Sequence, residues 1–149
     1  MNIIPSFFVA HTYYWGDTHI ENFGYDRAKN ISPVGTALKE NVLFTFHQDA
    51  PVILPNMFET IWCAVKRQTK DGVLLNQDEG ISVIDAIKAV TINAAYQYFE
   101  ENKKGSIKEG KLANFIIVDK NPLKVNIDDL KSIKILETIK EGKTLFKLS

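Results

Sequence analysis

Two short apolar runs in the first fifty residues have the pattern of buried strands. Residues 6–10 (SFFVA) lie between a proline and a polar cluster, and residues 42–47 (VLFTFH) are rich in β-branched and aromatic side chains. Helical periodicity occurs between and after these runs, and strands that alternate with helices are typical of parallel sheets. The pattern therefore predicts an α/β fold for the first two thirds of the chain.

Three helices are predicted from apolar stripes and capping signals. The first covers residues 33–40, with Ser32 as its cap. The second starts at Asn56, which has a glutamate three residues on as its capping-box partner. The third covers residues 82–101 and opens with a serine–aspartate capping pair.

The segment between the first strand and the first helix has no clear hydrophobic period. Residues 11–30 (HTYYWGDTHIENFGYDRAKN) are rich in aromatic residues, Gly, Asp and Asn. A loop of this length in a compact domain is usually functional or disordered, and the aromatic content argues against disorder. The sequence therefore predicts a long functional loop here.

The last third of the chain has a different pattern of residues. Glycines punctuate a turn-rich stretch, residues 115–119 (FIIVD) form a predicted strand, and residues 133–139 and 144–148 form a predicted hairpin around KEGK. We therefore expect two parts, with strands and helices alternating in residues 1–103 and mostly strands in residues 104–149.

Composition narrows the classes of function. The 149 residues include 18 basic and 18 acidic side chains, so the net charge is zero, whereas nucleic-acid and membrane-surface binding need a basic excess. No apolar run reaches membrane-spanning length and residues 1–11 lack a secretory leader, so we expect a cytoplasmic location. The single cysteine, Cys63, excludes an internal disulfide, and its apolar helical neighbours predict a buried packing thiol.

Polar side chains end both predicted strands. Alternation along a strand places His47 and Asp49 on one face of the second strand, and His11 ends the first. Chemistry in (β/α) barrels sits at the carboxyl ends of the strands, so His11 and Asp49 are expected to converge, with His47 a layer below. The spacing leaves a second interpretation open, in which His11 caps a loop, His47 is a core histidine and Asp49 makes a turn before Pro51.

Five motifs occur in an order found in one family. They are AHTYYWGDTH (10–19), ISPVGTAL (31–38), HQDAPV (47–52), ISVIDAIKAVTINAAY (81–96) and GSIKEGKLANFIIVD (105–119). By these motifs the chain resembles the C-terminal part of metal-dependent amidohydrolases, particularly the subgroup that includes N-substituted formamide deformylase. The last two motifs in this order are the most specific part of the resemblance.

The resemblance implies a fold. Full enzymes of this family are several times longer and combine a (β/α)₈ TIM barrel with a small β-sandwich. Residues 1–103 would then be the C-terminal part of the barrel. Residues 6–11 would be its sixth strand, residues 30–32 a short seventh strand and residues 42–49 its eighth. Residues 104–149 would supply the C-terminal strands of the sandwich.

The resemblance also implies a metal site. His11 matches a metal-ligating histidine of the sixth strand, and Asp49 matches the eighth-strand aspartate, a ligand that also shuttles a proton. The expected cofactor is a divalent metal, zinc by ligand type, with one or two ions in the full-length enzyme. Metal-activated water would attack the carbonyl of a small amide-like substrate.

Four further residues are candidates around this site. Trp15, Asp17 and His19 follow the first strand and are candidate substrate contacts, although Trp15 would equally serve as a structural anchor and His19 as a solvated polar residue. His47 is either a partner that orients a ligand or a core histidine without a catalytic role.

The sequence departs from the family pattern in its metal ligands. It has three histidines and no His-x-His pair, so the ligands of the family's earlier strands are missing. We therefore expect a piece of a longer enzyme that alone hydrolyses nothing and holds no metal tightly. We also expect it to self-associate through exposed strand edges. A free-standing, non-catalytic binding module and a pseudo-enzyme remnant are the alternatives.

Overall fold

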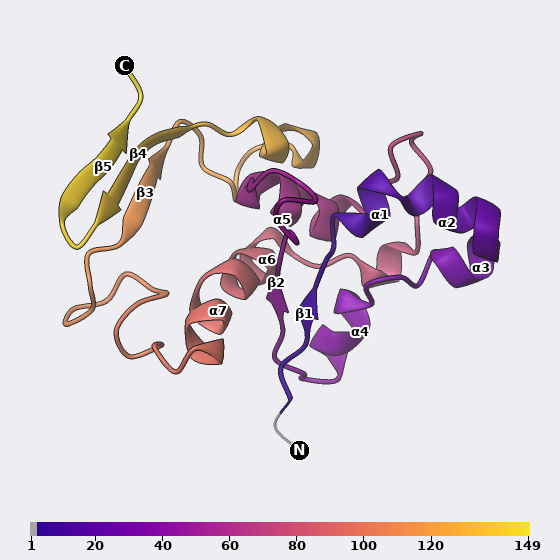
Figure 1. Ribbon diagram of the computed structural model, residues 1–149, viewed down its shortest axis with the longest axis horizontal. Helices are drawn as coiled ribbons and strands as arrows, with labels where there is room; N and C mark the ends of the chain where they lie inside the picture. The colour runs from indigo at the N-terminus through magenta and orange to yellow at the C-terminus, as the bar shows by residue number, and fades with distance from the viewer. Residues whose placement is uncertain (1–2) are drawn as a thin grey trace.

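The computed structural model describes residues 3–149. A two-stranded sheet lies near the middle of the molecule and a three-stranded sheet lies at one end (Figure 1). The elements in chain order are β1 (Ser6–Phe7), α1 (His11–Tyr14), α2 (Gly16–Phe23), α3 (Tyr25–Ala28), α4 (Val34–Lys39), β2 (Thr45–Phe46), α5 (Met57–Lys66), the 3-10 helix η1 (Gln77–Glu79), α6 (Val83–Val90), α7 (Ile92–Gln97), β3 (Phe115–Val118), the 3-10 helix η2 (Ile127–Ser132), β4 (Ile135–Lys140) and β5 (Lys143–Lys147).

The strands β1 and β2 pair in parallel, as the alternation of strands and helices predicts. Phe7 lies opposite Phe46, and the amide of His47 donates to the carbonyl of Phe7 at 3.1 Å. Each strand is shorter than the apolar run that predicted it. Among the described residues the two strands have only each other as sheet neighbours. Few residues of either apolar run therefore take part in strand hydrogen bonds.

This direct pairing corrects the strand numbering that the resemblance implied. The sixth and eighth strands of a barrel are separated by the seventh, so they exchange no hydrogen bonds. β1 and β2 do exchange them, whereas residues 30–32 form a turn and bends, with the carbonyls of Ile31 and Ser32 accepting from the guanidinium of Arg67. If β2 is the eighth strand, β1 takes the place of the seventh.

Residues 11–30 are helical, so the prediction of a long loop is wrong. The helices α1, α2 and α3 follow one another along one side of the molecule (Figure 1). Each of these helices is about two turns long or shorter. Gly24, with a φ of 77°, separates α2 from α3. Their buried residues, Thr12, Gly16 and Ala28, are small, and a search for large aliphatic side chains at helical spacing does not recognise them.

The predicted helix caps had mixed outcomes. Asn56 and Ser82 each accept a hydrogen bond from the amide three residues on, which confirms both caps. Ser32 does not cap α4, because its φ is 53° and its carbonyl is bound by Arg67. The predicted helix 82–101 breaks at Thr91, whose hydroxyl donates back to the carbonyl of Ile87. None of the helices described in residues 3–149 is long and apolar enough to cross a bilayer.

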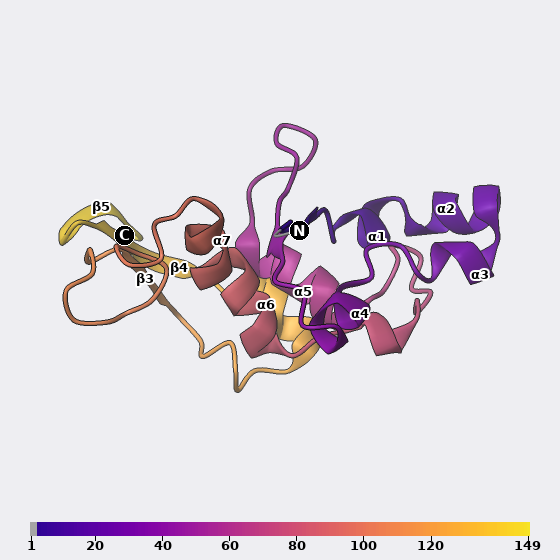
Figure 2. The same ribbon diagram turned by 90° about the horizontal axis from the view of Figure 1, so that it is seen from below.

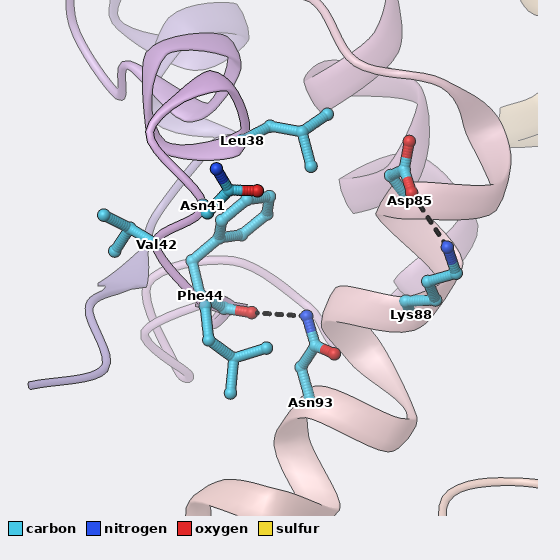
Figure 3. A pocket seen from close by; sticks show the side chains of 8 residues that line it. Leu38, Asn41, Val42, Phe44, Asp85, Lys88 and Asn93 are labelled. Atoms are coloured by element: carbon cyan, nitrogen blue, oxygen red, sulfur yellow. Dashed lines mark hydrogen bonds and ion pairs between the residues drawn. The ribbon is translucent and has the colours of Figure 1, made fainter. Parts of the chain in front are cut away.

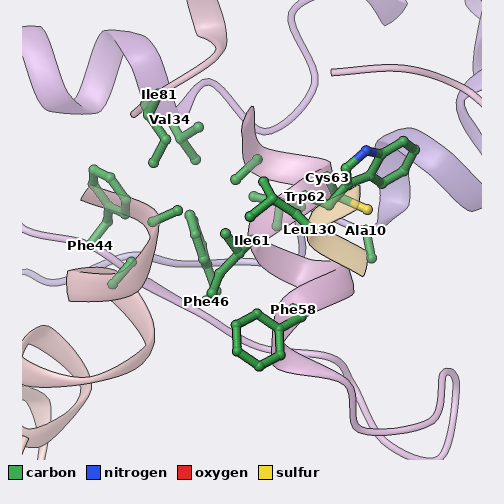
Figure 4. Close-up of a cluster of buried hydrophobic side chains, with 14 of the residues drawn as sticks. Ala10, Val34, Phe44, Phe46, Phe58, Ile61, Trp62, Cys63, Ile81 and Leu130 are labelled. Carbon is green, nitrogen blue, oxygen red and sulfur yellow. The ribbon is translucent and has the colours of Figure 1, made fainter. Parts of the chain in front are cut away.

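The hydrophobic core is centred on α5. Figure 4 shows side chains from β2, α4, α5 and η2 packed together, among them Val34, Phe46, Ile61, Trp62 and Leu130. Cys63 is fully buried, as predicted, and burial raises the pKa of its thiol. Because η2 brings Leu130 into this core, the C-terminal third packs on the first two thirds; the division at residue 103 stays a prediction.

The strands β3, β4 and β5 form an antiparallel sheet in that order, which confirms the predicted C-terminal hairpin. The sheet lies apart from α5 (Figure 1). Large apolar side chains on it remain open to solvent, with exposed fractions of 46% for Ile116, 65% for Leu145 and 48% for Phe146. This sheet therefore lacks the apolar cover that a sandwich partner would provide.

Candidate functional site

His11 is positioned by a turn directly after β1. Val9 and Ala10 are almost completely buried, and the amide of His11 donates to the carbonyl of Phe8 at 3.1 Å. The backbone leaves the strand direction at this turn, and His11 becomes the first residue of α1. Its imidazole is thus anchored beyond the carboxyl end of β1.

The ring of His11 lies in a cluster of other rings. Its centroid is 5.2 Å from that of Phe8, 5.1 Å from that of Trp15 and 4.9 Å from that of His19. Nδ1 of His11 and Nε2 of His19 are 3.2 Å apart, so one ring donates a hydrogen bond to the other according to their tautomers. Phe23 stacks on the far side of the pair, 5.8 Å from His19.

The sequence contains a signal for this cluster. Positions 11, 15, 19 and 23 recur every four residues, and residues four apart on a helix lie on the same face. The interpretation of this segment as a loop left His19 as either a substrate contact or a solvated side chain, whereas the structure places it against His11.

Asp49 follows the carboxyl end of β2. Its φ is 52° and its carbonyl accepts from the amide of Val52 at 2.8 Å, so the chain turns sharply there. Figure 2 shows the segment between β2 and α5 projecting from the rest of the molecule. Asp49 is exposed on this segment.

Electrostatics connect Asp49 with His11. Burial lowers the pKa of His11, the charge of His19 lowers it further, and the charge of Asp49 acts in the opposite direction. The net result is a pKa below the ordinary value of 6.5. Because β1 and β2 are parallel neighbours, His11 and Asp49 both follow the strands at the same edge of the small sheet.

The remaining candidates differ in what they contact. The ring of His47 lies 5.3 Å from Phe8, the same ring that packs on His11. Trp15 packs directly on His11. Asp17 is engaged elsewhere, since its Oδ2 accepts from the amide of Asp71 at 3.1 Å. The structure therefore gathers Trp15 and His19 around His11, places His47 against Phe8, and uses Asp17 to hold a neighbouring turn.

The donors present suit a borderline metal ion such as zinc. Imidazole nitrogen and carboxylate oxygen are ordinary zinc ligands, and His11 and Asp49 supply one of each. Within residues 3–149, however, no three His, Cys, Asp or Glu side chains are close enough together to hold an ion. The residues fit zinc in chemistry but fall short of the three or four ligands that protein sites use.

A separate hollow lies at the other end of β2. It has a volume of about 240 Å³ and is lined by residues that precede β2 and by the start of the α6–α7 pair (Figure 3). Asn93 donates to the carbonyl of Phe44 there, and Asp85 pairs with Lys88. Because residues 41–44 enter the strand and Asp49 leaves it, this hollow is distinct from the rim that carries His11.

Comparison with known proteins identifies relatives of the whole chain. A model described as "Amidohydrolase family" matches residues 1–146. N-substituted formamide deformylase from Arthrobacter pascens is 29% identical over 133 residues, which cover 86% of this chain and 24% of that protein. The chain thus spans about a quarter of the length of this relative.

Solved structures give the same picture. An uncharacterized metal-dependent hydrolase from Pyrococcus furiosus superimposes with a TM-score of 0.66 and 25% identity, over 83% of this chain and 25% of that one. 5-Methylcytosine deaminase from Klebsiella pneumoniae gives a TM-score of 0.57 and 18% identity, over 80% of this chain and 28% of that one. The deaminase match shows likeness of fold alone.

Proposed function

Because this chain belongs to the amidohydrolase family, we propose that it is the C-terminal part of a metal-dependent hydrolase that cleaves carbon–nitrogen bonds of small amide-like molecules. One observation carries the proposal: the parallel paired strands β1 and β2 lead into His11 and Asp49 at the same edge of the sheet. The formamide deformylase name of a relative supports chemistry at a carbon–nitrogen bond.

In this proposal β1 and β2 are adjacent strands of a (β/α)₈ barrel, the seventh and the eighth. Residues 1–103 belong to the barrel, and residues 104–149 supply strands of a sandwich. The role of His11 then rests on its place after the strand that pairs with β2, and no longer on a match to the sixth strand. The other metal ligands come from parts of the enzyme outside this chain, which agrees with the quarter of its relative's length that it spans.

The residues at the rim have distinct tasks in such a reaction. A divalent ion, zinc by the chemistry of these donors, would supply a water molecule of lowered pKa. The exposed carboxylate of Asp49 accepts a proton from the attacking water and returns it to the leaving nitrogen. His11 would hold the ion, while Trp15 beside it would offer an apolar wall to the substrate. His47 supports His11 through the shared Phe8 ring.

The test is hydrolysis by a protein that extends this chain upstream of Met1 in the same reading frame, assayed on N-substituted formamides and other small amides. Asp49→Asn should lower kcat by about 10²–10⁴-fold because the proton acceptor is lost. Asp26→Asn, an exposed carboxylate on α3, should leave kcat unchanged. An upstream frame without His-x-His, or full activity in Asp49→Asn, would refute the proposal.

The isolated chain has its own expected behaviour. We expect the 149 residues alone to release no amine from these substrates and to hold zinc weakly, since two ligands do not complete a site. We also expect pairing with a second copy, because both outer strands of the C-terminal sheet carry exposed apolar side chains. Light scattering that finds a monomer at high concentration would contradict the expected self-association. A tight, stoichiometric zinc signal would contradict the expected weak metal binding.

A further inference from the structure

The two imidazoles at the rim face each other across a short gap. Nδ1 of His11 and Nε2 of His19 are 3.2 Å apart. Two nitrogen ligands at about 2.0–2.1 Å from one tetrahedral zinc ion are about 3.3–3.4 Å apart, by the geometry of the tetrahedral angle. The gap between these nitrogens therefore matches the separation of two ligands on one ion.

The relative placement of the rings also suits a shared ion. Their centroids are 4.9 Å apart, which is closer than a straight head-to-head arrangement around a 3.2 Å contact allows. The planes are inclined by 46°. The rings thus meet at an angle rather than head to head, which leaves room for an ion beside the line that joins the two nitrogens.

The surroundings hold this pair in place. Phe8 and Trp15 pack against the His11 ring, and Phe23 stacks on the His19 ring with an interplanar angle of 19°. Both histidines remain partly exposed, so water and ions reach them. A pre-organised pair loses little side-chain freedom when it binds an ion.

We propose that His11 and His19 together chelate one divalent transition-metal ion, through Nδ1 and Nε2 respectively, with water in the remaining positions. Imidazole donors favour zinc, copper, nickel and cobalt over magnesium and calcium, which prefer oxygen ligands. The binding itself needs neither Asp49 nor hydrolysis. Its placement at the hydrolytic centre rests on the proposed function.

The test uses the purified 149-residue chain and Co²⁺, with Mg²⁺ as the comparison ion. Co²⁺ is followed by its visible ligand-field absorption, and Zn²⁺ by the ¹⁵N resonances of the histidine rings. We expect one saturable Co²⁺ site of low affinity, as two protein ligands provide, and no competition from Mg²⁺. Zn²⁺ should shift Nδ1 of His11 and Nε2 of His19. Shifts confined to other ring nitrogens would overturn the proposal.

Variants separate chelation from a simple hydrogen bond. Glutamine keeps hydrogen-bonding capacity but is a poor ligand for these ions, so His19→Gln and His11→Gln should each weaken Co²⁺ binding at least tenfold. The double variant should be little worse than either single variant, because the two ligands share one ion. Glu21→Gln, an exposed change on α2, should bind as the parent does. Circular dichroism confirms that each variant is folded.

The outcomes also keep this inference apart from the proposed function. If His19→Gln binds Co²⁺ as tightly as the parent chain, the pair is only hydrogen-bonded and the inference is wrong, while the role of Asp49 stands or falls by its own kinetic test. If the pair binds Co²⁺ as expected but Asp49→Asn retains full hydrolysis in the longer protein, the ion site is real and the hydrolytic assignment is wrong.

Discussion

Replacing Arg67 by methionine would remove a buried guanidinium that holds the segment between α3 and α4. Arg67 ends α5 with no exposed surface. Its Nη1 donates to the carbonyls of Ile31 at 2.8 Å and Ser32 at 3.1 Å, and its Nη2 donates to the carbonyl of Lys29 at 2.9 Å. Methionine keeps much of the apolar volume but offers these carbonyls no donor.

The expected loss of stability follows from these contacts. A hydrogen bond from a charged donor contributes about 1.5–3 kcal/mol, and removal of one partner from a buried ionic arrangement costs about 3–5 kcal/mol. Burial lowers the pKa of Arg67 to about 10, although the negative charge of Glu79 acts to raise it. The guanidinium is therefore still charged at neutral pH. Methionine no longer requires a charged group to be buried, which offsets part of the loss of the three hydrogen bonds. We therefore expect the free energy of unfolding to fall by about 3–5 kcal/mol.

The assay is urea unfolding of the parent chain, Arg67→Met and Arg27→Met, followed by circular dichroism and tryptophan fluorescence. Arg27 is an exposed arginine on α3, so its replacement should change the free energy of unfolding by less than about 0.5 kcal/mol. If Arg67→Met is no less stable than Arg27→Met, the three carbonyl contacts do not hold this segment and the reasoning is wrong.

Three further predictions concern stability and reactivity. Gly35→Ala should destabilise the chain by about 1–3 kcal/mol in the same assay, because the added Cβ would overlap the backbone carbonyl oxygen of Asp78; parental stability would refute this contact. Burial raises the pKa of Glu79, but hydrogen bonds from Thr36 and nearby positive charges outweigh it and hold the pKa below 4.5. Because the pKa of Glu79 is lower in the folded chain than in the unfolded chain, the ionised carboxylate stabilises the fold above the unfolded pKa. This stabilisation should be lost as the pH falls below about 4.5, and Glu79→Gln should make the free energy of unfolding less dependent on pH in that range. Cys63 should react with a thiol reagent only after unfolding, and rapid labelling of the native chain would contradict its burial.

Local signals in the sequence predicted those elements whose structure depends on neighbouring residues. The caps at Asn56 and Ser82 and the C-terminal hairpin are set by side chains and turns within a few residues, and all three are present. The parallel pairing of β1 with β2 followed from the alternation of strands and helices. The buried thiol of Cys63 followed from the apolar stripe around it.

The features that the sequence did not reveal depend on distant partners. Ser32 has the residue type of a cap, but the guanidinium of Arg67 binds its carbonyl from 35 positions away. The break at Thr91 lies within an otherwise continuous apolar stripe, where its backbone leaves the helical region with φ −125° and ψ −91°. The pairing of His11 with His19 was hidden because a ring-rich helical face lacks the aliphatic spacing that marks most amphipathic helices.

The central claim is that His11 and Asp49 face one site, and the pKa of His11 tests it most directly. It is measured at low salt from the ¹⁵N resonances of the ring, in the parent chain and in Asp49→Asn, with Asp26→Asn as the control. Since the charge of Asp49 raises the pKa of His11, its removal should lower that pKa, and the control should not change it. An identical His11 pKa in the parent chain and Asp49→Asn would mean that the two groups do not share a site.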